Sequence, residues 1–151
     1  MLDDVDRRIL RGLQNDPSLP VSELAEKVRA SIGITTRRLD RMRESGVLRG
    51  QNTVIDWRRL GYEAEVSLRF TLDKTNPKAF EEFIEAARDI PEVIEIQTFL
   101  GRVDVRLSVI ARDMAHYQKI YREAILMLPH IAEIESLMQV AEIKNGGALP
   151  I

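Results

Sequence analysis

Apolar residues recur at helical spacing in three short stretches of the first 50 residues. The first stretch follows a capping aspartate and is broken at 15–18, where Asn-Asp-Pro-Ser favours a turn. The second begins after Pro20. The third runs from about Ile32 to Ser45, with Ser31 as its N-cap and Gly46 as its stop. The pattern therefore predicts three short helices.

The third predicted helix has two sides of different chemistry. Ile34, Leu39 and Met42, together with Thr35, are expected to pack on the first two helices. The opposite side is a largely polar stripe formed by Ile32, Gly33, Thr36, Arg37, Asp40, Arg41 and Glu44. Two short helices with a tight turn between them form a helix-turn-helix unit, whose second helix presents such a stripe to the major groove of DNA.

Beyond Gly46 the pattern changes from helical to extended. Residues 47–55, with Arg49-Gly50 inside them, predict a short β-wing, and residues 57–61 predict a hinge. We therefore divide the chain into a winged helix-turn-helix DNA-binding domain at 1–50, a wing strand and hinge at 51–62, and a second domain at 63–151.

The second domain contains an internal duplication. The sequence IPEVIEI at 90–96 returns 38 residues later as LPHIAEI at 128–134. An amphipathic helix precedes each copy, and an alternating strand precedes each helix, at 66–72 and 103–109. The β-α-β unit thus occurs twice, which predicts an α+β chain whose second domain has the ferredoxin-like βαββαβ topology. Right-handed crossovers place both helices on one face of the sheet.

The other face of this sheet has no helix to cover it. A half-covered sheet of this size favours packing against a second copy, and we expect self-association. The alternative is a solvated polar face, which Ser67, Arg69 and Thr71 would line.

Composition excludes several classes of protein. With 44% apolar and 30% charged residues the chain can build packed cores, which argues against disorder. It has no cysteine, hence no disulfide framework or thiolate metal site. No apolar run approaches the roughly 20 residues of a membrane span, and the acidic start lacks the features of a signal peptide. We expect a soluble cytoplasmic protein.

Positive charge is concentrated near the start of the chain. Residues 1–50 hold ten Lys/Arg against eight Asp/Glu, whereas residues 51–151 hold twelve against sixteen. The segment 29–49 alone carries six arginines against Asp40 and Glu44. A basic stretch on an acidic chain indicates a site for phosphate, although a solvated helix face gives similar counts.

Within this stretch particular side chains suit DNA. Arginine can pair with guanine through two hydrogen bonds, and serine or threonine can reach a base edge or a phosphate. We expect Thr36, Arg37 and Arg41 to face DNA, with Ser31 and Thr35 near its backbone. Arg38 lies between the two sides and is also expected to brace the fold through a carboxylate.

A second candidate site is the stretch 98–104, which joins the two central strands. Gly101 permits a tight turn whose N–H groups can meet a carboxylate, Arg102 adds charge, and Asp104 suits an α-ammonium group. These groups match the two ends of an amino acid. The alternative is an ordinary hairpin in which Asp104 bonds its own turn.

Nothing in the sequence favours catalysis, a metal or a cofactor. Neither His116 nor His130 has a partner at metal-ligand spacing, and there is no G-x-G-x-x-G, P-loop or G-x-S-x-G motif. We expect no catalytic residue. Two further classes stay open, an architectural protein that wraps DNA without an effector, and a ferredoxin-like enzyme or storage protein, which leaves the basic helix-turn-helix unexplained.

In this order, the motifs resemble the Lrp/AsnC family of leucine-responsive, or feast/famine, transcriptional regulators. The similarity covers nearly the whole chain and is carried by residues 2–10, 23–28, Ser31, 38–48, Gly101-x-x-Asp104, 113–114 and 128–129, with Ala148-Leu149-Pro150-Ile151 similar to one branch of the family. The resemblance implies a regulator of transcription that binds double-stranded DNA through its first domain and an amino acid or related metabolite through its second.

The resemblance also implies an assembly. Family members dimerise through the effector domain, often form octamers, and bind amino-acid effectors between dimers. By position, one subunit would contribute Thr98, Gly101, Arg102, Val103 and Asp104, and the last strand of a neighbouring subunit would contribute Ser136 and Met138. The ligand would then act by shifting the assembly and hence the geometry of DNA binding.

Three departures from the family pattern bear on detail. Arg29-Ala30 stands where the family has glycine, and a left-handed residue there costs a non-glycine about 1 kcal/mol, so we expect an altered turn. Ile32-Gly33-Ile34 replaces the usual proline and hydroxyl residues, which favours a different base preference. The loop 101–104 is positive and non-aromatic, which favours a more acidic effector.

Overall fold

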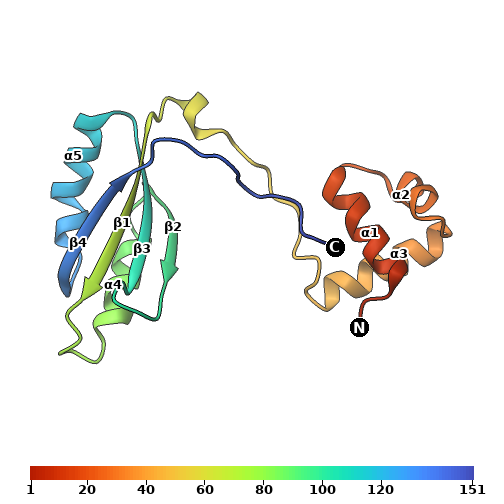
Figure 1. The fold of residues 1–151 in the computed structure, drawn as a ribbon, viewed down its shortest axis with the longest axis horizontal. Coiled ribbons are helices and arrows are strands. Elements are labelled where there is room, and N and C mark those ends of the chain that lie inside the picture. Colours follow the sequence, from red (N-terminus) through yellow and green to blue (C-terminus); the bar gives the residue numbers. More distant parts are fainter. The chain divides into compact units, whose positions relative to one another are not determined.

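The computed structural model describes residues 1–151, which form two compact units (Figure 1). The first unit comprises residues 1–54 and 144–151, and the second comprises residues 55–143. The division expected from sequence assigned 144–151 to the second domain. The structure groups that segment with the first unit because side chains of the first helix form hydrogen bonds with its backbone.

The first unit contains the three expected helices, α1 (Asp4–Asn15), α2 (Val21–Val28) and α3 (Ile32–Glu44). A reciprocal capping box starts α1, since the carboxylates of Asp3 and Asp6 each accept the other's backbone N–H. Ser31 caps α3 by accepting the N–H of Ile34 at 3.2 Å. Left-handed Gly46 follows the end of α3.

The core of this unit is small. It consists of Ile9 from α1, Leu24 and Val28 from α2, and Leu39 and Met42 from α3. Gly12 lets α1 and α2 approach closely, because a Cβ there would lie 2.7 Å from a methyl carbon of Leu24. Each of the three helices therefore contributes one short apolar stripe to a shared core.

Ile34 corrects one expectation from the sequence. It was expected to pack on the other helices, but its side chain is 39% exposed. The buried stripe of α3 runs through Thr35, Leu39 and Met42, at spacings of four and three residues. Ile34 precedes this stripe by one residue, roughly 100° around the helix, and so points away from the core.

The expected wing strand is absent. Residues 49–56 have no regular secondary structure, and a 3-10 helix at Trp57–Leu60 follows them. An extended segment becomes a strand only when a neighbouring strand satisfies its backbone groups, and none lies beside this segment. Gln51 instead reaches back and donates to the carbonyl of Pro17 at 2.6 Å.

The turn between α2 and α3 keeps a left-handed residue although it lacks glycine. Arg29 has φ 55° and ψ 50°. Its N–H bonds the carbonyl of Glu26, and the N–H of Ala30 bonds that of Ala25, as in a Schellman motif. The motif thus forms with a strained non-glycine residue.

We expect Arg29→Gly to stabilise the first unit by about 0.5–1 kcal/mol. Glycine removes the strain of the left-handed conformation, about 1–2 kcal/mol. Part of this gain is lost because glycine increases the conformational entropy of the unfolded chain. Urea denaturation followed by circular dichroism measures the change. Lys27→Gly, inside α2, is the matched control and should destabilise by about 1 kcal/mol. Loss of stability in Arg29→Gly would contradict this account of the turn.

The second unit has the expected ferredoxin-like topology. Its elements follow the order β1 (Ala64–Leu72), α4 (Ala79–Arg88), β2 (Val93–Thr98), β3 (Val105–Ala111), α5 (Met114–Glu123), a 3-10 turn at Ile125–Met127, and β4 (Ile131–Met138). The strands are ordered β2-β3-β1-β4 and every neighbouring pair is antiparallel. The duplication read from the sequence is therefore confirmed as two β-α-β halves.

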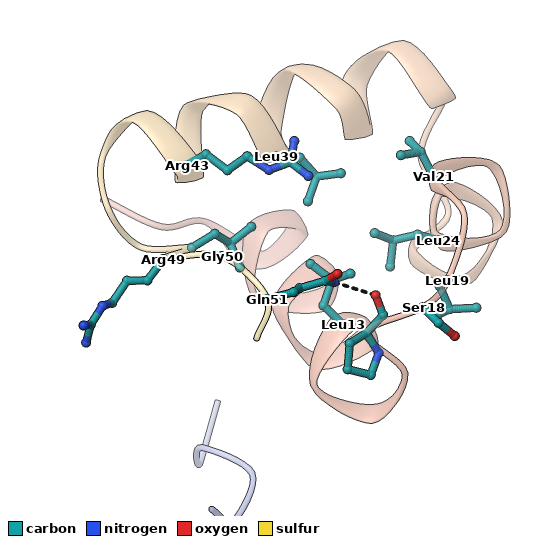
Figure 2. Close-up of a pocket in the computed structure, with 12 residues that line it drawn as sticks. Leu13, Ser18, Leu19, Val21, Leu24, Leu39, Arg43, Arg49, Gly50 and Gln51 are labelled. Carbon is teal, nitrogen blue, oxygen red and sulfur yellow. Dashed lines mark hydrogen bonds between the residues drawn. The ribbon is translucent and has the colours of Figure 1, made fainter. Parts of the chain in front are cut away.

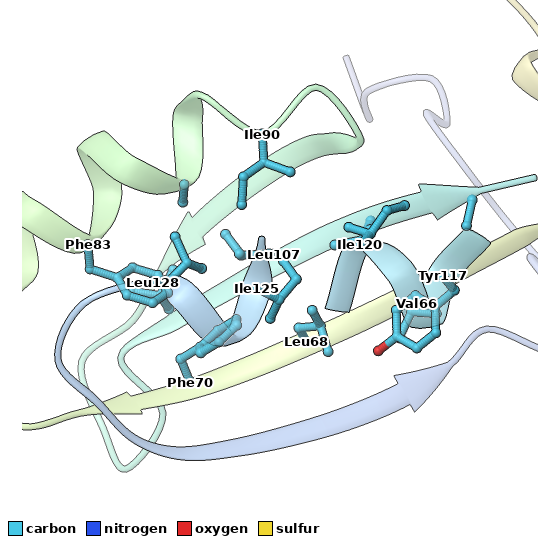
Figure 3. Close-up of a cluster of buried hydrophobic side chains, with 14 of the residues drawn as sticks. Val66, Leu68, Phe70, Phe83, Ile90, Leu107, Tyr117, Ile120, Ile125 and Leu128 are labelled. Atoms are coloured by element: carbon cyan, nitrogen blue, oxygen red, sulfur yellow. The ribbon is translucent and has the colours of Figure 1, made fainter. Parts of the chain in front are cut away.

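The core of the second unit fills the space between the sheet and its two helices (Figure 3). The side chains of Val66, Leu68 and Phe70, at alternate positions of β1, point toward the helices. The ring centroid of Phe70 lies 4.9 Å from that of Phe83 in α4.

None of the helices in the chain is long and apolar enough to cross a bilayer.

Candidate DNA-binding surface and effector loop

The polar stripe of α3 faces outward. Every member of the stripe predicted from the sequence is exposed: Ile32, Gly33, Thr36, Arg37, Asp40, Arg41 and Glu44. Arg37 lies roughly 200° around the helix from Thr35 and from Leu39, directly opposite the buried side. In this unit, α3 therefore presents a continuous arginine-bearing face that a DNA groove can receive.

The arginines of α3 differ in their partners. Arg37 makes no hydrogen bond or ion pair within the chain and is exposed. Arg43, also exposed, pairs with Asp40 at 3.1 Å. An unpaired guanidinium keeps all its donors for a ligand, so Arg37 has the most donors to offer to a base or a phosphate.

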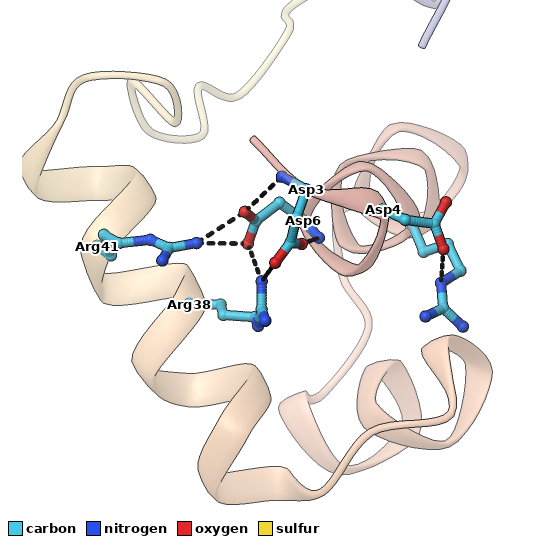
Figure 4. Close-up of polar contacts among 6 residues, drawn as sticks. Asp3, Asp4, Asp6, Arg38 and Arg41 are labelled. Carbon is cyan, nitrogen blue, oxygen red and sulfur yellow. Dashed lines mark hydrogen bonds and ion pairs between the residues drawn. The ribbon is translucent and has the colours of Figure 1, made fainter. Parts of the chain in front are cut away.

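Arg38 and Arg41 converge on one buried carboxylate (Figure 4). Asp6 in α1 is 0% exposed, and its oxygens accept from Nη1 of Arg38 at 2.9 Å and from Nη2 of Arg41 at 2.8 and 2.7 Å. Arg38 also donates to Asp3 at 2.6 Å. The expected bracing role of Arg38 is confirmed, and Arg41 shares it while its side chain stays 57% exposed.

The two arginines of this cluster stabilise the ionised forms of its two aspartates. Burial alone would raise the pKa of Asp6, but hydrogen bonds from Arg38 and from the Asp3 N–H, with the charge of Arg41, outweigh it and lower the pKa. The hydrogen bond from Arg38 is the main reason that the pKa of Asp3 falls to about 2. The cluster therefore fixes α3 against α1 with both carboxylates ionised.

Thr35 corrects a second expectation. It was placed near the DNA backbone, but it is fully buried and its hydroxyl donates to the carbonyl of Ser31 at 3.0 Å. Thr36 is exposed, although its hydroxyl donates to the carbonyl of Ile32 at 2.9 Å. Ser31 is exposed at the start of α3, with its hydroxyl already capping the helix. The exposed candidates for DNA are therefore Ser31, Thr36, Arg37 and Arg41.

A hollow of about 660 Å³ lies on another side of the first unit (Figure 2). Its apolar walls include Leu13, Leu24 and Leu39, and Arg43 and Arg49 lie at its edge. Leu39 belongs to the buried side of α3, so this hollow is separate from the exposed stripe.

In the second unit, the loop 98–104 is the second candidate site. It joins the edge strand β2 to β3, so the expectation that it joins the two central strands is wrong. Thr98, Gly101 and Arg102 are exposed and Val103 is half-buried. Gly101 has φ +156°, a conformation that side chains rarely adopt. Shallow hollows of about 320 and 240 Å³ flank the loop, the first lined by Arg69, Phe99, Leu100, Gly101, Val103 and Arg106, the second by Arg69, Thr71, Arg102, Val103, Glu133, Ile134 and Glu135.

Asp104 already has partners. Its carboxylate accepts the N–H of Leu72 at 2.8 Å and lies 2.9 Å from Nζ of Lys74. Burial would raise its pKa, but these two contacts lower it. The side chain therefore bonds the end of β1 rather than its own turn, and the ammonium of Lys74 occupies one side of it.

Ser136 and Met138 lie away from this loop within one chain. They belong to β4, where they pair with Leu68 and Val66 of β1, whereas the loop leaves the sheet where Val105 pairs with Phe70. The strand β4 is also at the opposite edge of the sheet from β2. Within one chain, the part of β4 that shares a hollow with the loop is 133–135, and neither Ser136 nor Met138 lines that hollow.

The sheet face without helices is polar. Arg106 donates to Ser67 at 2.7 Å and pairs with Glu95 at 3.3 Å, Ser108 donates to Glu65, and Arg69 pairs with Glu135 at 3.8 Å. Ser67, Arg69 and Thr71 line this face, as predicted in the alternative to packing against a second copy.

Two features of these surfaces were not predicted from the sequence. One is Asp6, the buried partner of Arg38 and Arg41. The signal that could have found it is the pair of aspartates three residues apart, Asp3 and Asp6, which has the spacing of a capping box. The other is the contact of residues 144–151 with the first unit, for which the sequence offers no local signal.

Known proteins are similar to this chain over nearly its whole length. Residues 2–49 match a family model described as winged helix-turn-helix DNA-binding, and residues 65–149 match the Lrp/AsnC ligand binding domain. The proline dehydrogenase transcriptional activator of Rhodobacter capsulatus is 36% identical, over 95% of this chain and 93% of its own. The leucine-responsive regulatory protein of Klebsiella pneumoniae is 29% identical, over 99% and 92%.

Solved structures agree with these relatives. An AsnC family transcriptional regulator from Agrobacterium tumefaciens is 32% identical with a TM-score of 0.87, over 99% of this chain and 97% of its own. A transcriptional regulator from Neisseria meningitidis, solved in complex with L-methionine, is 26% identical with a TM-score of 0.90, over 99% and 97%.

Proposed function

This chain belongs to the Lrp/AsnC family of transcriptional regulators, and on that premise we propose that it reads DNA with the exposed side of α3 and adjusts this binding to an amino acid or a related metabolite. The single observation that carries the DNA half is the outward-facing stripe of α3 with Arg37 unpaired at its centre. Arg37, Arg41 and Thr36 meet base edges, and Ser31 lies near a phosphate.

A second copy completes the DNA reader. One helix-turn-helix covers one half-site, and a symmetric dimer matches two half-sites about one helical turn apart. The sheet face without helices supports the pairing, because its charges alternate between Arg69 or Arg106 and the glutamates beside them, so that two copies can meet with opposite charges opposed. Assembly beyond the dimer, to an octamer, is part of the same proposal.

The effector site lies between subunits. Thr98, Gly101, Arg102 and Val103 of one chain hold the head group of the ligand, and Asp104 positions this loop through Leu72 and Lys74. Ser136 and Met138 of another chain shape the side-chain end of the ligand. The separation of these two sets within one chain supports a shared site. The L-methionine complex of the Neisseria regulator supports an amino-acid ligand. The ammonium group of Lys74 already pairs with the carboxylate of Asp104, whereas the guanidinium of Arg102 has no partner. We therefore propose an effector with an additional carboxylate.

A thermal-shift screen of the twenty amino acids tests the sensor half. A ligand at about 100 times its Kd stabilises the native state by about 2.7 kcal/mol and raises the melting temperature by several degrees. We expect the largest shifts with acidic amino acids, and Arg102→Ala should remove them. Arg122→Ala, an exposed charge on α5, is the control and should keep them. No shift with any amino acid would favour an architectural protein that binds DNA without an effector.

A further inference from the structure

The segment 144–151 is bound to α1 by hydrogen bonds that span 135 residues or more of sequence. The side-chain amide of Gln14 pairs with the backbone of Leu149 in both directions, donating to its carbonyl at 3.2 Å and accepting its N–H at 2.5 Å. Nε of Arg11 donates to the backbone oxygen of Ile151 at 2.6 Å. The segment is thus held through its backbone by two side chains of one helix.

An apolar hollow lies beneath this segment. The first unit contributes Leu2, Leu10, Leu13, Val47 and Leu48 to a hollow of about 460 Å³, and Leu149 and Ile151 line the same hollow. Ile151 is half-buried there, whereas residues 140–150 are exposed. The docking is therefore specific in its hydrogen bonds but covers little surface, which is typical of a contact that opens at low free-energy cost.

The position of this segment in the chain links the two units. The ligand-binding family model runs to residue 149, yet residues 144–151 pack with the DNA-binding unit. Only residues 139–143 separate the docked segment from β4, which ends at Met138. The strand proposed to contact the effector is thus tied, through five residues, to a helix of the DNA-binding unit.

We propose that residues 144–151 are a latch on α1 that transmits the state of β4 to the DNA-binding unit. The partner of α1 in this contact is the chain's own segment, because Gln14 and Arg11 bond its backbone groups and Ile151 forms part of the wall of the apolar hollow. The latch contacts α1 and the segment after α3, and leaves the exposed stripe of α3 free. Its role in transmission rests on the proposed function, since it requires that an effector moves β4.

Cross-linking tests the docking without any effector. The chain has no cysteine, so Val47→Cys/Leu149→Cys introduces a single pair, at two residues that line the same hollow, and leaves Gln14 and Arg11 in place. A short bis-maleimide should join this pair within one chain, giving a product of monomer mass. Glu26→Cys/Leu149→Cys, with one cysteine on the exposed side of α2, is the control and should react far less. Absence of the first product, or a product only between chains, would overturn the latch.

DNA titrations with and without an amino acid test the transmission. Gln14→Ala removes both bonds to Leu149, and Asn15→Ala, at the exposed neighbouring position, is its control. We expect L-methionine or L-glutamate to change the DNA affinity of the wild type and of Asn15→Ala equally, and that of Gln14→Ala by less than twofold. An unchanged response in Gln14→Ala would overturn the proposal.

The two proposals fail in distinguishable ways. If no amino acid shifts the melting temperature or the DNA affinity of the wild type, the sensor function fails and the transmission fails with it. The cross-link then still decides whether the segment docks on α1. If the wild type responds and Gln14→Ala responds equally, the sensor function stands and only the latch is rejected.

Discussion

Replacing Arg37 with alanine is expected to weaken DNA binding roughly 5- to 150-fold without unfolding the protein. A guanidinium that pairs with guanine through two hydrogen bonds contributes about 1–3 kcal/mol. Arg37 has no partner in the chain that would compete for its donors, and no partner that its loss would leave unsatisfied. The entire effect should therefore appear in binding and none in the free energy of unfolding.

The measurement is a titration of a DNA fragment that the full chain has selected from a random-sequence pool. Arg43→Ala removes the same charge from the same helix, but from a side chain paired with Asp40, and should cost far less. Arg37→Lys keeps the charge but loses the bidentate hydrogen-bonding geometry. It should therefore keep the affinity for phosphate and relax the preference for particular bases. Equal losses in Arg37→Ala and Arg43→Ala would show that only total charge matters.

Asp6→Ala should destabilise the first unit by about 2–3 kcal/mol. The change removes a fully buried carboxylate that accepts hydrogen bonds from two arginines and caps the start of α1. The loss should stay below the largest values for broken buried ion pairs, because Arg38 and Arg41 are 23% and 57% exposed and can turn to water. Arg41 would also lose its fixed position, so DNA affinity should fall.

Urea denaturation at neutral pH measures this loss. Asp4→Ala is the matched control, because Asp4 is in the same turn but 79% exposed and paired only with Arg8, and it should cost less than about 0.5 kcal/mol. Since folding lowers the pKa values of Asp6 and Asp3, their contribution is present above pH 3.8 and is lost as the pH falls toward the lowered values, about 2 for Asp3. A loss in Asp6→Ala no greater than in Asp4→Ala would contradict the bracing role.

Local patterns predicted most of the fold. Apolar spacing and capping residues such as Ser31 and Gly46 predicted the helices α1 to α3. The duplicated strand sequence predicted the ferredoxin-like sheet. The errors arose where a residue's environment depends on its neighbours in space. Ile34 lies one residue off the buried stripe, and the wing has no strand beside it to pair with.

The candidate sites could be predicted only in part. The exposed stripe of α3 followed from helical geometry, because a helix that buries Leu39 and Met42 must expose Arg37. Asp6 and Gln14 were not identified, since their partners lie 32 and 135 residues away and no periodicity encodes such contacts. Asp104 was assigned to a ligand from its type alone, whereas Leu72 and Lys74 hold it from another segment.

Arginine labelling tests the DNA-reading surface most directly. Phenylglyoxal modifies accessible guanidinium groups, and mass spectrometry locates the modified residues. With the selected DNA fragment bound, we expect modification of Arg37 to fall sharply, while Arg88 on α4 and Arg122 on α5 remain as reactive as in the free protein. Undiminished labelling of Arg37, with Arg88 or Arg122 shielded instead, would contradict the account.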